Sequence, residues 1–346
     1  MQEKGCKYGT HRVLHPEGVL PQAALKIHND MHIYNNEILI NVQALNVDSA
    51  SFTQISKEQG GDPEKIGQRI MDIVKERGKL QNPVTGSGGM LIGTVEKIGD
   101  QLKGTIDLKE GDKIATLVSL SLTPLYIEEI TAVQKDIDRV EIKGKAILFE
   151  SGIYAKLPED MNENLALAAL DVAGAPAQVA KLVRPGDSVL ILGATGKSGM
   201  MCAYEAVKRV GPTGNVVASD LFEESLEALK EHGFCHEAFA ADATKPVEVL
   251  HKALAANGGK EYDVAINVVN VNNTEMSTIL PVRNEGVVYF FSMATSFTKA
   301  ALGAEGVGKD VTMIVGNGYT KGHAAITLAE LRESEALREI FEKRYM

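Results

Sequence analysis

A glycine-rich turn between a buried strand and a helix constrains this chain more than any other stretch. Val189 to Leu192 are consecutive apolar residues, as in a strand of a parallel sheet, and Met200 to Val210 carry apolar residues at helical spacing. Gly193, Gly196 and Gly199 lie between them, three residues apart. This spacing allows a tight exit from the strand, a close backbone approach and close packing of the helix on the sheet. The N-terminus of the helix is therefore predicted to bind a pyrophosphate.

The segment after the turn indicates which dinucleotide is expected. A second strand, Asn215 to Ser219, leads to Asp220, which lies 21 residues after Gly199. An acid at this distance accepts hydrogen bonds from the adenosine ribose, and its charge would repel a 2′-phosphate, so NAD is expected rather than NADP. The alternative is an ordinary strand–helix turn of an α/β protein. A P-loop is rejected, because the position that needs its first glycine is Ile191.

Further cofactor contacts are expected at the carboxyl ends of later strands, where nicotinamide and its ribose lie in doubly wound sheets. Asn270 follows the apolar run Tyr262 to Val269, and Ser292 ends the run that begins at Gly286. Asp242 could approach adenine or cap the next helix. Lys197 is either a neighbour of the phosphates or a solvated lysine. The predicted cofactor-binding residues are Gly193, Thr195, Gly196, Lys197, Ser198, Gly199, Asp220, Asn270 and Ser292.

Composition narrows the class of protein. The net charge of -10 over 346 residues argues against a general affinity for nucleic acid or anionic membranes. No apolar run approaches about 18 residues, and the first residues lack the apolar core of a signal peptide, so a cytoplasmic protein is expected. Cys6, Cys202 and Cys235 are far apart without CxxC spacing, so neither a disulfide framework nor a zinc knuckle is predicted.

The first part of the chain carries a family pattern. GGMLIGTVEKIG, from residue 88, aligns without a gap to the GHExxGxVxxVG stretch of the medium-chain dehydrogenase/reductase superfamily, and Gly111 to Ile114 resembles its later GDRV. The segment from Ser151 to Gly193 resembles that superfamily's passage into its nucleotide domain. The matching positions of the first stretch are Gly88, Gly93, Val95, Ile98 and Gly99.

This resemblance and the alternation of strands and helices predict an α/β protein. We expect a barrel-like (GroES-like), β-rich catalytic domain over residues 1–155 and a Rossmann doubly wound parallel sheet over 156–317. A last helix, Ala324 to Arg344, would return to the catalytic domain within residues 318–346. Val311 to Val315 would form an edge strand. Such strands commonly pair across a dimer in this superfamily, so a homodimer or a tetramer is expected.

The departures from the superfamily pattern predict that the enzyme has no catalytic metal. Where zinc-dependent members have His and Glu, this chain has Gly89 and Met90, and where they have a cysteine ligand it has Asp48. One carboxylate without histidine or thiolate partners is a poor zinc site. Zinc alcohol dehydrogenase activity is therefore not expected.

At a closer level, four segments resemble the 3,5-diaminohexanoate dehydrogenase family of anaerobic lysine fermentation. They are GCKYGTHRVLHPEGVLPQ, NVDSASFTQI, TGSGGMLIGTV and GATGKSGMM. The resemblance implies NAD-dependent oxidative deamination of (3S,5S)-3,5-diaminohexanoate to 5-amino-3-oxohexanoate, ammonia and NADH. No metal is needed for this reaction, because the nitrogen lone pair drives the departure of hydride.

The implied reaction requires a general base near the C3 nitrogen of a small amino-acid substrate. Asp48 is the candidate base, because it occupies the superfamily position that faces the reacting carbon, and Ser51 could orient the amine or the water. Both residues could instead cap a turn. Arg12 or Lys7 could bind the substrate carboxylate, and the remaining polar candidates are His11, His15, Asn82 and Ser87. For these six residues, a solvated or purely structural side chain is the alternative.

Other functions fit the same fold. A zinc-free quinone or enoyl reductase of the superfamily would usually favour NADPH, which Asp220 opposes. A non-catalytic protein that binds dinucleotide for structure or sensing would keep the glycine turn, and only turnover would separate it from an enzyme. An amino-alcohol or amino-acid dehydrogenase would differ only in the residues of its pocket.

Overall fold

The computed structural model describes residues 3–316 and 318–345, which divide into two compact units, 1–160 and 161–346. The expected boundary at 155 lies five residues before this division. The ends that the sequence analysis placed at 1, 317 and 346 lie outside the described residues. Each unit has its own sheet and its own hydrophobic core.

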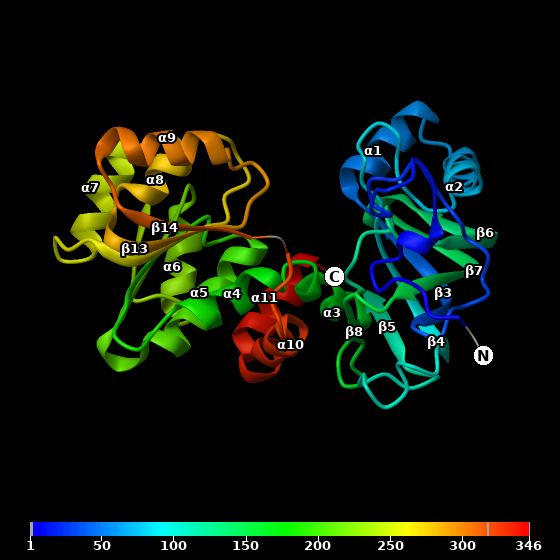
Figure 1. The fold of residues 1–346 in the computed structure, drawn as a ribbon. Helices are drawn as coiled ribbons and strands as arrows, with labels where there is room; N and C mark the ends of the chain where they lie inside the picture. The colour runs from blue at the N-terminus through cyan, green and yellow to red at the C-terminus, as the bar shows by residue number, and fades with distance from the viewer. Residues whose placement is uncertain (1–2, 317, 346) are drawn as a thin grey trace. The chain divides into compact units, whose positions relative to one another are not determined.

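The second unit is built on a six-stranded sheet in which all neighbouring strands are parallel (Figure 1). In spatial order the strands are β11 (Glu237–Ala240), β10 (Asn215–Asp220), β9 (Ser188–Leu192), β12 (Tyr262–Asn267), β13 (Val282–Phe290) and β14 (Val311–Val315). The central position of β9 places the glycine turn where the strand order reverses, which is the usual ligand-binding point of such sheets. The predicted Rossmann sheet is confirmed.

Helices cover both faces of this sheet, as the continuous burial of Val189 to Leu192 in β9 requires. Ile191 packs with apolar residues of α5 and α11, whereas Leu190 and Leu192 pack with residues of α7, α8 and α9. Figure 1 shows these two groups of helices on opposite sides of the strands. The helices are α3 (Glu163–Leu170), α4 (Gly174–Leu182), α5 (Lys197–Val210), α6 (Glu223–Glu231), α7 (Pro246–Ala256), α8 (Glu275–Ile279), α9 (Phe297–Val307), α10 (His323–Glu333) and α11 (Glu335–Tyr345).

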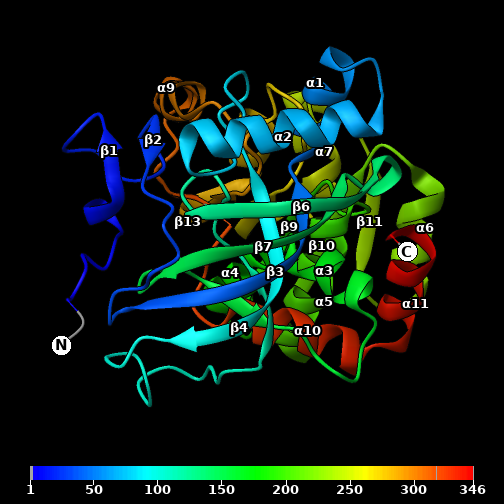
Figure 2. The same ribbon diagram turned by 90° about the vertical axis from the view of Figure 1, so that its right-hand side faces the viewer.

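The first unit contains a six-stranded antiparallel sheet in the order β6-β7-β3-β4-β5-β8 and a two-stranded sheet, β1-β2. Figure 2 shows β6, β7, β3 and β4 side by side, with α2 lying against β6. The elements are β1 (Val13–His15), β2 (Lys26–Ile27), β3 (Glu37–Val47), α1 (Ser49–Glu58), α2 (Pro63–Arg77), β4 (Gly89–Ile98), β5 (Lys113–Thr116), β6 (Leu125–Gln134), β7 (Arg139–Phe149) and β8 (Tyr154–Lys156). The expected β-rich first domain is confirmed.

Helix α2 shows how local sequence signals set the ends of an element. Asp62 accepts hydrogen bonds from the N–H groups of Glu64 and Lys65, and Pro63 occupies the first helical position. Gly78 ends the helix with φ of 74° in the left-handed region. Both ends are therefore set by residues that stand next to the helix in the sequence.

Two elements differ from expectation. Residues 51–61 are rich in Ser, Gln and Gly, a composition that predicts turns. Residues 51–58 instead lie in α1, because the Asp48 cap and the burial of Phe52 and Ile55 outweigh the weak helix propensity of Ser and Thr. The single last helix is instead α10 and α11, divided at Ser334. Both helices contact α3 and α5 of their own unit, and a return to the catalytic domain stays a prediction.

No single helix among residues 3–316 and 318–345 is long and apolar enough to cross a membrane. The bent pair α3 and α4 passes that test only when the two are taken together, on length and composition.

Candidate functional site

The glycine turn between β9 and α5 has the geometry of a phosphate-binding turn. Gly193 has φ of 84°, and a Cβ at Gly199 would lie 2.1 Å from the Gly193 carbonyl oxygen, so both positions require glycine. At Gly196, by contrast, a Cβ would meet only that same oxygen, at 3.5 Å. Gly196 is the N-cap of α5 and supplies no side chain to its free N–H groups. The open space before these donors fits the phosphates of a dinucleotide.

Asp220 ends β10 beside this turn, as the sequence predicted. Its Oδ2 accepts hydrogen bonds from the backbone N–H of Thr195 at 3.0 Å and from Thr195 Oγ1 at 2.7 Å. Its Oδ1 accepts the N–H of Leu221 at 2.7 Å. The structure therefore brings two predicted cofactor residues together, the buried Thr195 and the partly exposed Asp220.

The far end of the chain also reaches the turn, which sequence reasoning missed. Arg344 of α11 donates from Nη1 to the Thr195 carbonyl oxygen at 3.0 Å. The Lys197 ammonium lies 5.2 Å from the centre of the Tyr345 ring and 2.9 Å from an Asp171 carboxylate oxygen. Lys197 is thus paired at the helix start rather than simply solvated. No local signal marks the contacts of Arg344 and Tyr345, because they join residues about 150 positions apart in the sequence, and Asp171 lies 26 residues before Lys197.

Two other predicted cofactor residues, Asn270 and Ser292, follow the ends of strands. Asn270 is exposed after β12, and Ser292 follows β13, where its Oγ accepts the N–H of Ala294 at 3.1 Å. Ser198 lies in the first turn of α5 and is half-buried. Asp242 accepts hydrogen bonds from the N–H and hydroxyl of Thr244, so it supports the turn before α7.

Exposed apolar residues beside Asp220 are a second feature that sequence reasoning missed. Leu221 and Phe222 are 60% and 65% exposed immediately after the acid. Two large apolar side chains at the carboxyl end of a parallel strand suit the flat face of an adenine base. Their identity alone gave no signal, because Leu and Phe in an α/β chain are ordinarily buried.

In the first unit, Asp48 and Ser51 lie at the start of α1. Asp48 is exposed, and its Oδ1 accepts the N–H groups of Ala50 at 3.1 Å and Ser51 at 3.4 Å. Among the described residues, both donors that reach this carboxylate bond to Oδ1. The carboxylate therefore caps α1 and still presents Oδ2. Ser51 is buried, and its Oγ lies 2.5 Å from Thr85 Oγ1.

Asn82 and Ser87 flank the loop that adjoins α1. Asn82 is buried, and its side chain donates to the Ser51 carbonyl and to Gln54, and accepts the N–H of Val84 at 2.8 Å. Its backbone N–H bonds to the Ser87 carbonyl at 2.9 Å. Asn82 thus uses its side chain to hold the loop, which argues against direct contact with substrate. Ser87 is half-buried at the end of this loop.

Arg12 and His11 form a separate group around Glu37. Arg12 is 1% exposed, and its Nε and Nη2 donate to the two carboxylate oxygens of Glu37 at 2.7 Å each. His11 Nδ1 accepts the N–H of Cys6, so its Nε2 donates to Glu37 at 2.9 Å. Although burial opposes it, this pairing holds the pKa of Glu37 down at about 2.

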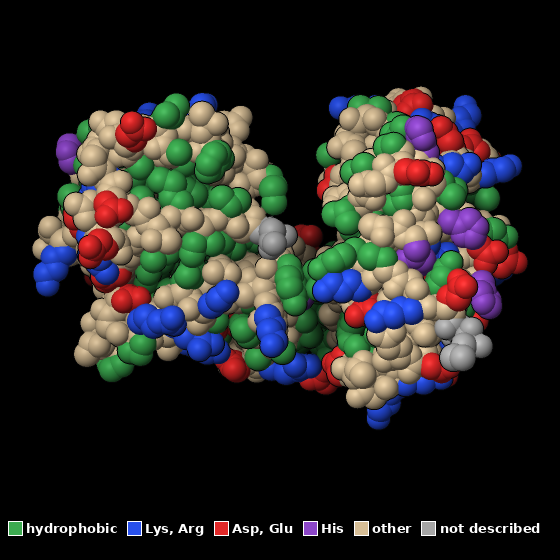
Figure 3. Space-filling model, viewed as in Figure 1, with side chains coloured by type: hydrophobic (Ala, Val, Ile, Leu, Met, Phe, Trp, Pro, Cys, Tyr) green, Lys and Arg blue, Asp and Glu red, His purple; other side chains and the backbone are tan. Residues whose placement is uncertain are grey.

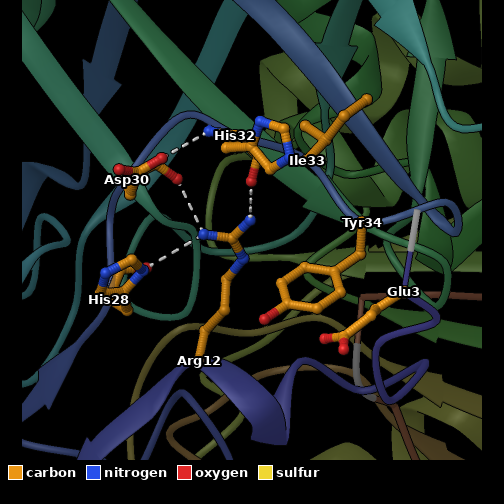
Figure 4. Close-up of a pocket in the computed structure, with 7 residues that line it drawn as sticks. All are labelled: Glu3, Arg12, His28, Asp30, His32, Ile33 and Tyr34. Atoms are coloured by element: carbon orange, nitrogen blue, oxygen red, sulfur yellow. Dashed lines mark hydrogen bonds between the residues drawn. The ribbon is translucent and has the colours of Figure 1, made fainter. Parts of the chain in front are cut away.

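Arg12 also borders a polar cavity of about 650 Å³ in the first unit (Figure 4). The backbone carbonyls of His28, Asp30 and His32 point at the guanidinium and accept its remaining N–H groups. The N–H donors of Arg12 are therefore already used within the protein. This argues against the expectation that Arg12 binds the substrate carboxylate. Glu3, Ile33 and Tyr34 also line this cavity, and Figure 4 shows Tyr34 and Glu3 on the side away from His28 and Asp30.

The other two N-terminal candidates are exposed. The Lys7 ammonium lies 4.7 Å from the centre of the Tyr8 ring, and His15 is the exposed last residue of β1. Neither contact defines a binding site.

The backbone at Gly89 leaves no room for the histidine that zinc-dependent members of the superfamily have at this position. Gly89 has φ of 107°, and a Cβ there would lie 2.0 Å from the Asn46 carbonyl oxygen. A histidine could not occupy this backbone without a shift of β3. Within the described ranges, no group of three or more His, Cys, Asp or Glu is placed to hold a metal. The metal-free site stays a prediction.

Comparison with solved structures shows the fold. The alcohol dehydrogenase TADH from Thermus sp. ATN1 superposes with a TM-score of 0.53 at 18% identity, over 91% of this chain and 89% of that one. The chain therefore shares the fold of that dehydrogenase, and a dehydrogenase of this fold uses a nicotinamide cofactor.

Sequence comparison is more specific. Residues 11–158 match the family model described as the L-erythro-3,5-diaminohexanoate dehydrogenase N-terminal domain. The L-erythro-3,5-diaminohexanoate dehydrogenase of Acetoanaerobium sticklandii is 74% identical over 99% of this chain and its own full length. That of Fusobacterium nucleatum subsp. nucleatum is 71% identical over the same shares. The chain belongs to the L-erythro-3,5-diaminohexanoate dehydrogenase family.

Proposed function

We propose that this chain catalyses the NAD-dependent oxidative deamination of (3S,5S)-3,5-diaminohexanoate, giving 5-amino-3-oxohexanoate, ammonia and NADH without a metal. The carrying observation is the 74% identity to the L-erythro-3,5-diaminohexanoate dehydrogenase of Acetoanaerobium sticklandii, over 99% of this chain and the full length of that one. Neither a quinone or enoyl reductase nor a non-catalytic binding protein is favoured by these relatives. In keeping with the acidic composition, we place the enzyme in the cytoplasm and its reaction in lysine fermentation.

Asp48 is the proposed general base. The C3 ammonium of the substrate must lose a proton before its nitrogen lone pair can expel hydride from C3, and water must then attack the resulting iminium. Oδ1 of Asp48 is fixed by two N–H groups of α1, so the carboxylate is oriented while Oδ2 can accept that proton. The carboxylate would also attract the cationic amine. Ser51, being buried and bonded to Thr85, supports the start of α1 rather than the substrate.

The residues of the second unit fit NAD. The nicotinamide supplies the hydride acceptor when the cofactor is bound. The glycine turn and the N-terminus of α5 would hold the pyrophosphate. Asp220 would accept a hydrogen bond from the ribose and repel a 2′-phosphate. Leu221 and Phe222 offer apolar surface for adenine beside it.

The test is the formation of NADH from NAD and 3,5-diaminohexanoate by the full chain. NADP, secondary alcohols, and NADPH with quinones and enones are measured in parallel. Turnover of the diamine with NAD, unchanged after dialysis against a zinc chelator, is the expected result. No turnover of the diamine, together with NADPH-dependent reduction of quinones or enones, would instead show that the chain is a quinone or enoyl reductase. Diamine turnover that the chelator abolishes would overturn the metal-free site.

A homodimer is the proposed assembly. β14 is an edge strand whose outer side pairs with no strand of the described chain, and Val315 on it is 66% exposed. The neighbouring α9 exposes Phe297 and Leu302 at 73% and 62%. Figure 3 shows apolar side chains gathered over the region of α9 and β14. An unpaired strand beside apolar surface suits pairing with a second copy.

A further inference from the structure

Hydrogen bonds from Thr195 and Leu221 already fix the Asp220 carboxylate within the protein. Oδ2 accepts two hydrogen bonds, both from Thr195, and Oδ1 accepts one, from the N–H of Leu221. A carboxylate oxygen offers about two lone-pair sites. Oδ2 is therefore fully used, and Oδ1 keeps one site at the exposed side of the strand end.

Thr195 itself sits on a fixed backbone. The N–H groups of Gly193 and Ala194 both donate to the Ser219 carbonyl at 2.9 and 3.1 Å, which ties the turn to the end of β10. Arg344 holds the Thr195 carbonyl from the other side at 3.0 Å. Thr195 is only 9% exposed. Its hydroxyl is consequently a rigid donor aimed at Asp220.

A rigid donor matters because cofactor choice depends on where the acid points. An aspartate at a strand end can rotate about χ1 and swing its carboxylate toward the ribose or into solvent. A carboxylate held toward the ribose accepts a hydroxyl hydrogen bond and opposes a 2′-phosphate by like-charge repulsion. A carboxylate free to swing away would lose both effects.

We propose that Thr195 is a positioning residue for cofactor selection, which holds the Asp220 carboxylate through Oγ1 so that NAD is bound and NADP is repelled. This role rests on the proposed preference for NAD. It assigns to the Thr195 side chain a function separate from phosphate binding, since the hydroxyl is directed at Asp220 and not at the open space by Gly196.

The test compares the dissociation constants of NADH and NADPH for the full chain by isothermal titration calorimetry. Thr195→Val removes the hydroxyl and keeps the branched shape and the backbone N–H, and Thr195→Ser keeps the hydroxyl. We expect Thr195→Val to lower the NADH-over-NADPH preference by roughly 3- to 10-fold, the range for one typical hydrogen bond, and Thr195→Ser to retain it. Asp220→Asn removes the charge itself and should give the largest change in the NADH-over-NADPH preference. Thr195→Ala, which removes the same hydroxyl without adding a methyl, is measured alongside in case the valine does not fold.

A purely structural threonine would give a different result. Thr195→Val and Thr195→Ala would then lower both affinities, or the melting temperature, with the preference unchanged. That outcome overturns the role of Thr195 and leaves the NAD preference standing. A wild-type chain that binds NADPH as tightly as NADH would instead show that the proposed NAD preference is wrong, and the role of Thr195 would fall with it.

Discussion

Asp48 combines two tasks at the scale of a single residue. One carboxylate oxygen caps α1, and the other is the proton acceptor that we propose. Capping and proton transfer have different chemical needs, because an amide oxygen caps a helix about as well as a carboxylate but is not a base at neutral pH. A conservative substitution can therefore separate the two.

Asp48→Asn should reduce kcat by about two orders of magnitude or more, the usual range for loss of a general base, with little change in thermal stability. Steady-state kinetics with the diamine and a melting curve test this together. Asp62→Asn makes the same change at the N-cap of α2 and should leave kcat unaltered. A kcat for Asp48→Asn close to that of the wild type would show that another group takes the proton.

Arg12 and Glu37 form a buried pair whose loss should show in stability. Glu37→Gln leaves the buried guanidinium without a counter-charge, which should lower the free energy of unfolding by about 3–5 kcal/mol. Glu129→Gln is the matched control, since Glu129 pairs with Lys143 on the exposed side of β6 and should have little effect. Urea unfolding followed by circular dichroism measures both. Equal stabilities of the two variants would contradict a structural role for Arg12.

The same pair predicts a pH dependence. The pKa of Glu37 falls from 4.5 to about 2 on folding, so its contribution is complete above pH 4.5 and is lost as the pH falls toward 2. The loss amounts to about 3 kcal/mol. The urea midpoint of the wild type should therefore drop more steeply than that of Glu37→Gln over this pH range. Parallel slopes would show that Glu37 is not the group responsible.

At the scale of an element, the turn before α5 assigns different tasks to its glycines. Gly199 is required by packing, because a Cβ would lie 2.1 Å from the Gly193 carbonyl oxygen. Gly196 has φ of −75° and open space before it, so the fold would accept a methyl group that the cofactor would not. The two positions separate stability from binding within one motif.

Gly196→Ala should weaken NADH binding by roughly tenfold or more and leave the melting temperature close to that of the wild type. Gly199→Ala should instead lower stability by about 1–3 kcal/mol, as overpacking does. Calorimetric titration with NADH and thermal melting of both variants provide the comparison. If Gly196→Ala bound NADH normally, the phosphates would have to lie elsewhere.

At the scale of the whole molecule, the proposed homodimer depends on the edge of the parallel sheet. Val315→Lys places a charge on the exposed edge strand, which opposes strand pairing, whereas Val247→Lys makes the same change on α7 at similar exposure. Light scattering should give twice the chain mass of 37.2 kDa for the wild type and Val247→Lys, and a lower mass for Val315→Lys. A wild-type mass of one chain would refute the dimer.

The candidate site shows which residues can be found from sequence and which cannot. The glycines and Asp220 were located because their spacing follows from a strand, a turn and a helix in succession. The sequence predicts that Arg12 and His11 bind substrate, because it shows no partner for their side chains in this unusual N-terminal segment. Glu37 lies 25 residues beyond Arg12, and only folding brings its carboxylate to the guanidinium.

By itself, the sequence determined the α/β class, the parallel sheet, the ends of α2 and the family. The spacing of apolar residues, the helix caps and the glycine spacing each depend on residues that are close together in the sequence. Only the tertiary structure decided that Arg12 is paired, that Asn82 holds a loop, and that Thr195 and Arg344 meet at the glycine turn. Hydrogen bonds between distant segments depend on where packing places each backbone, and no local pattern encodes that.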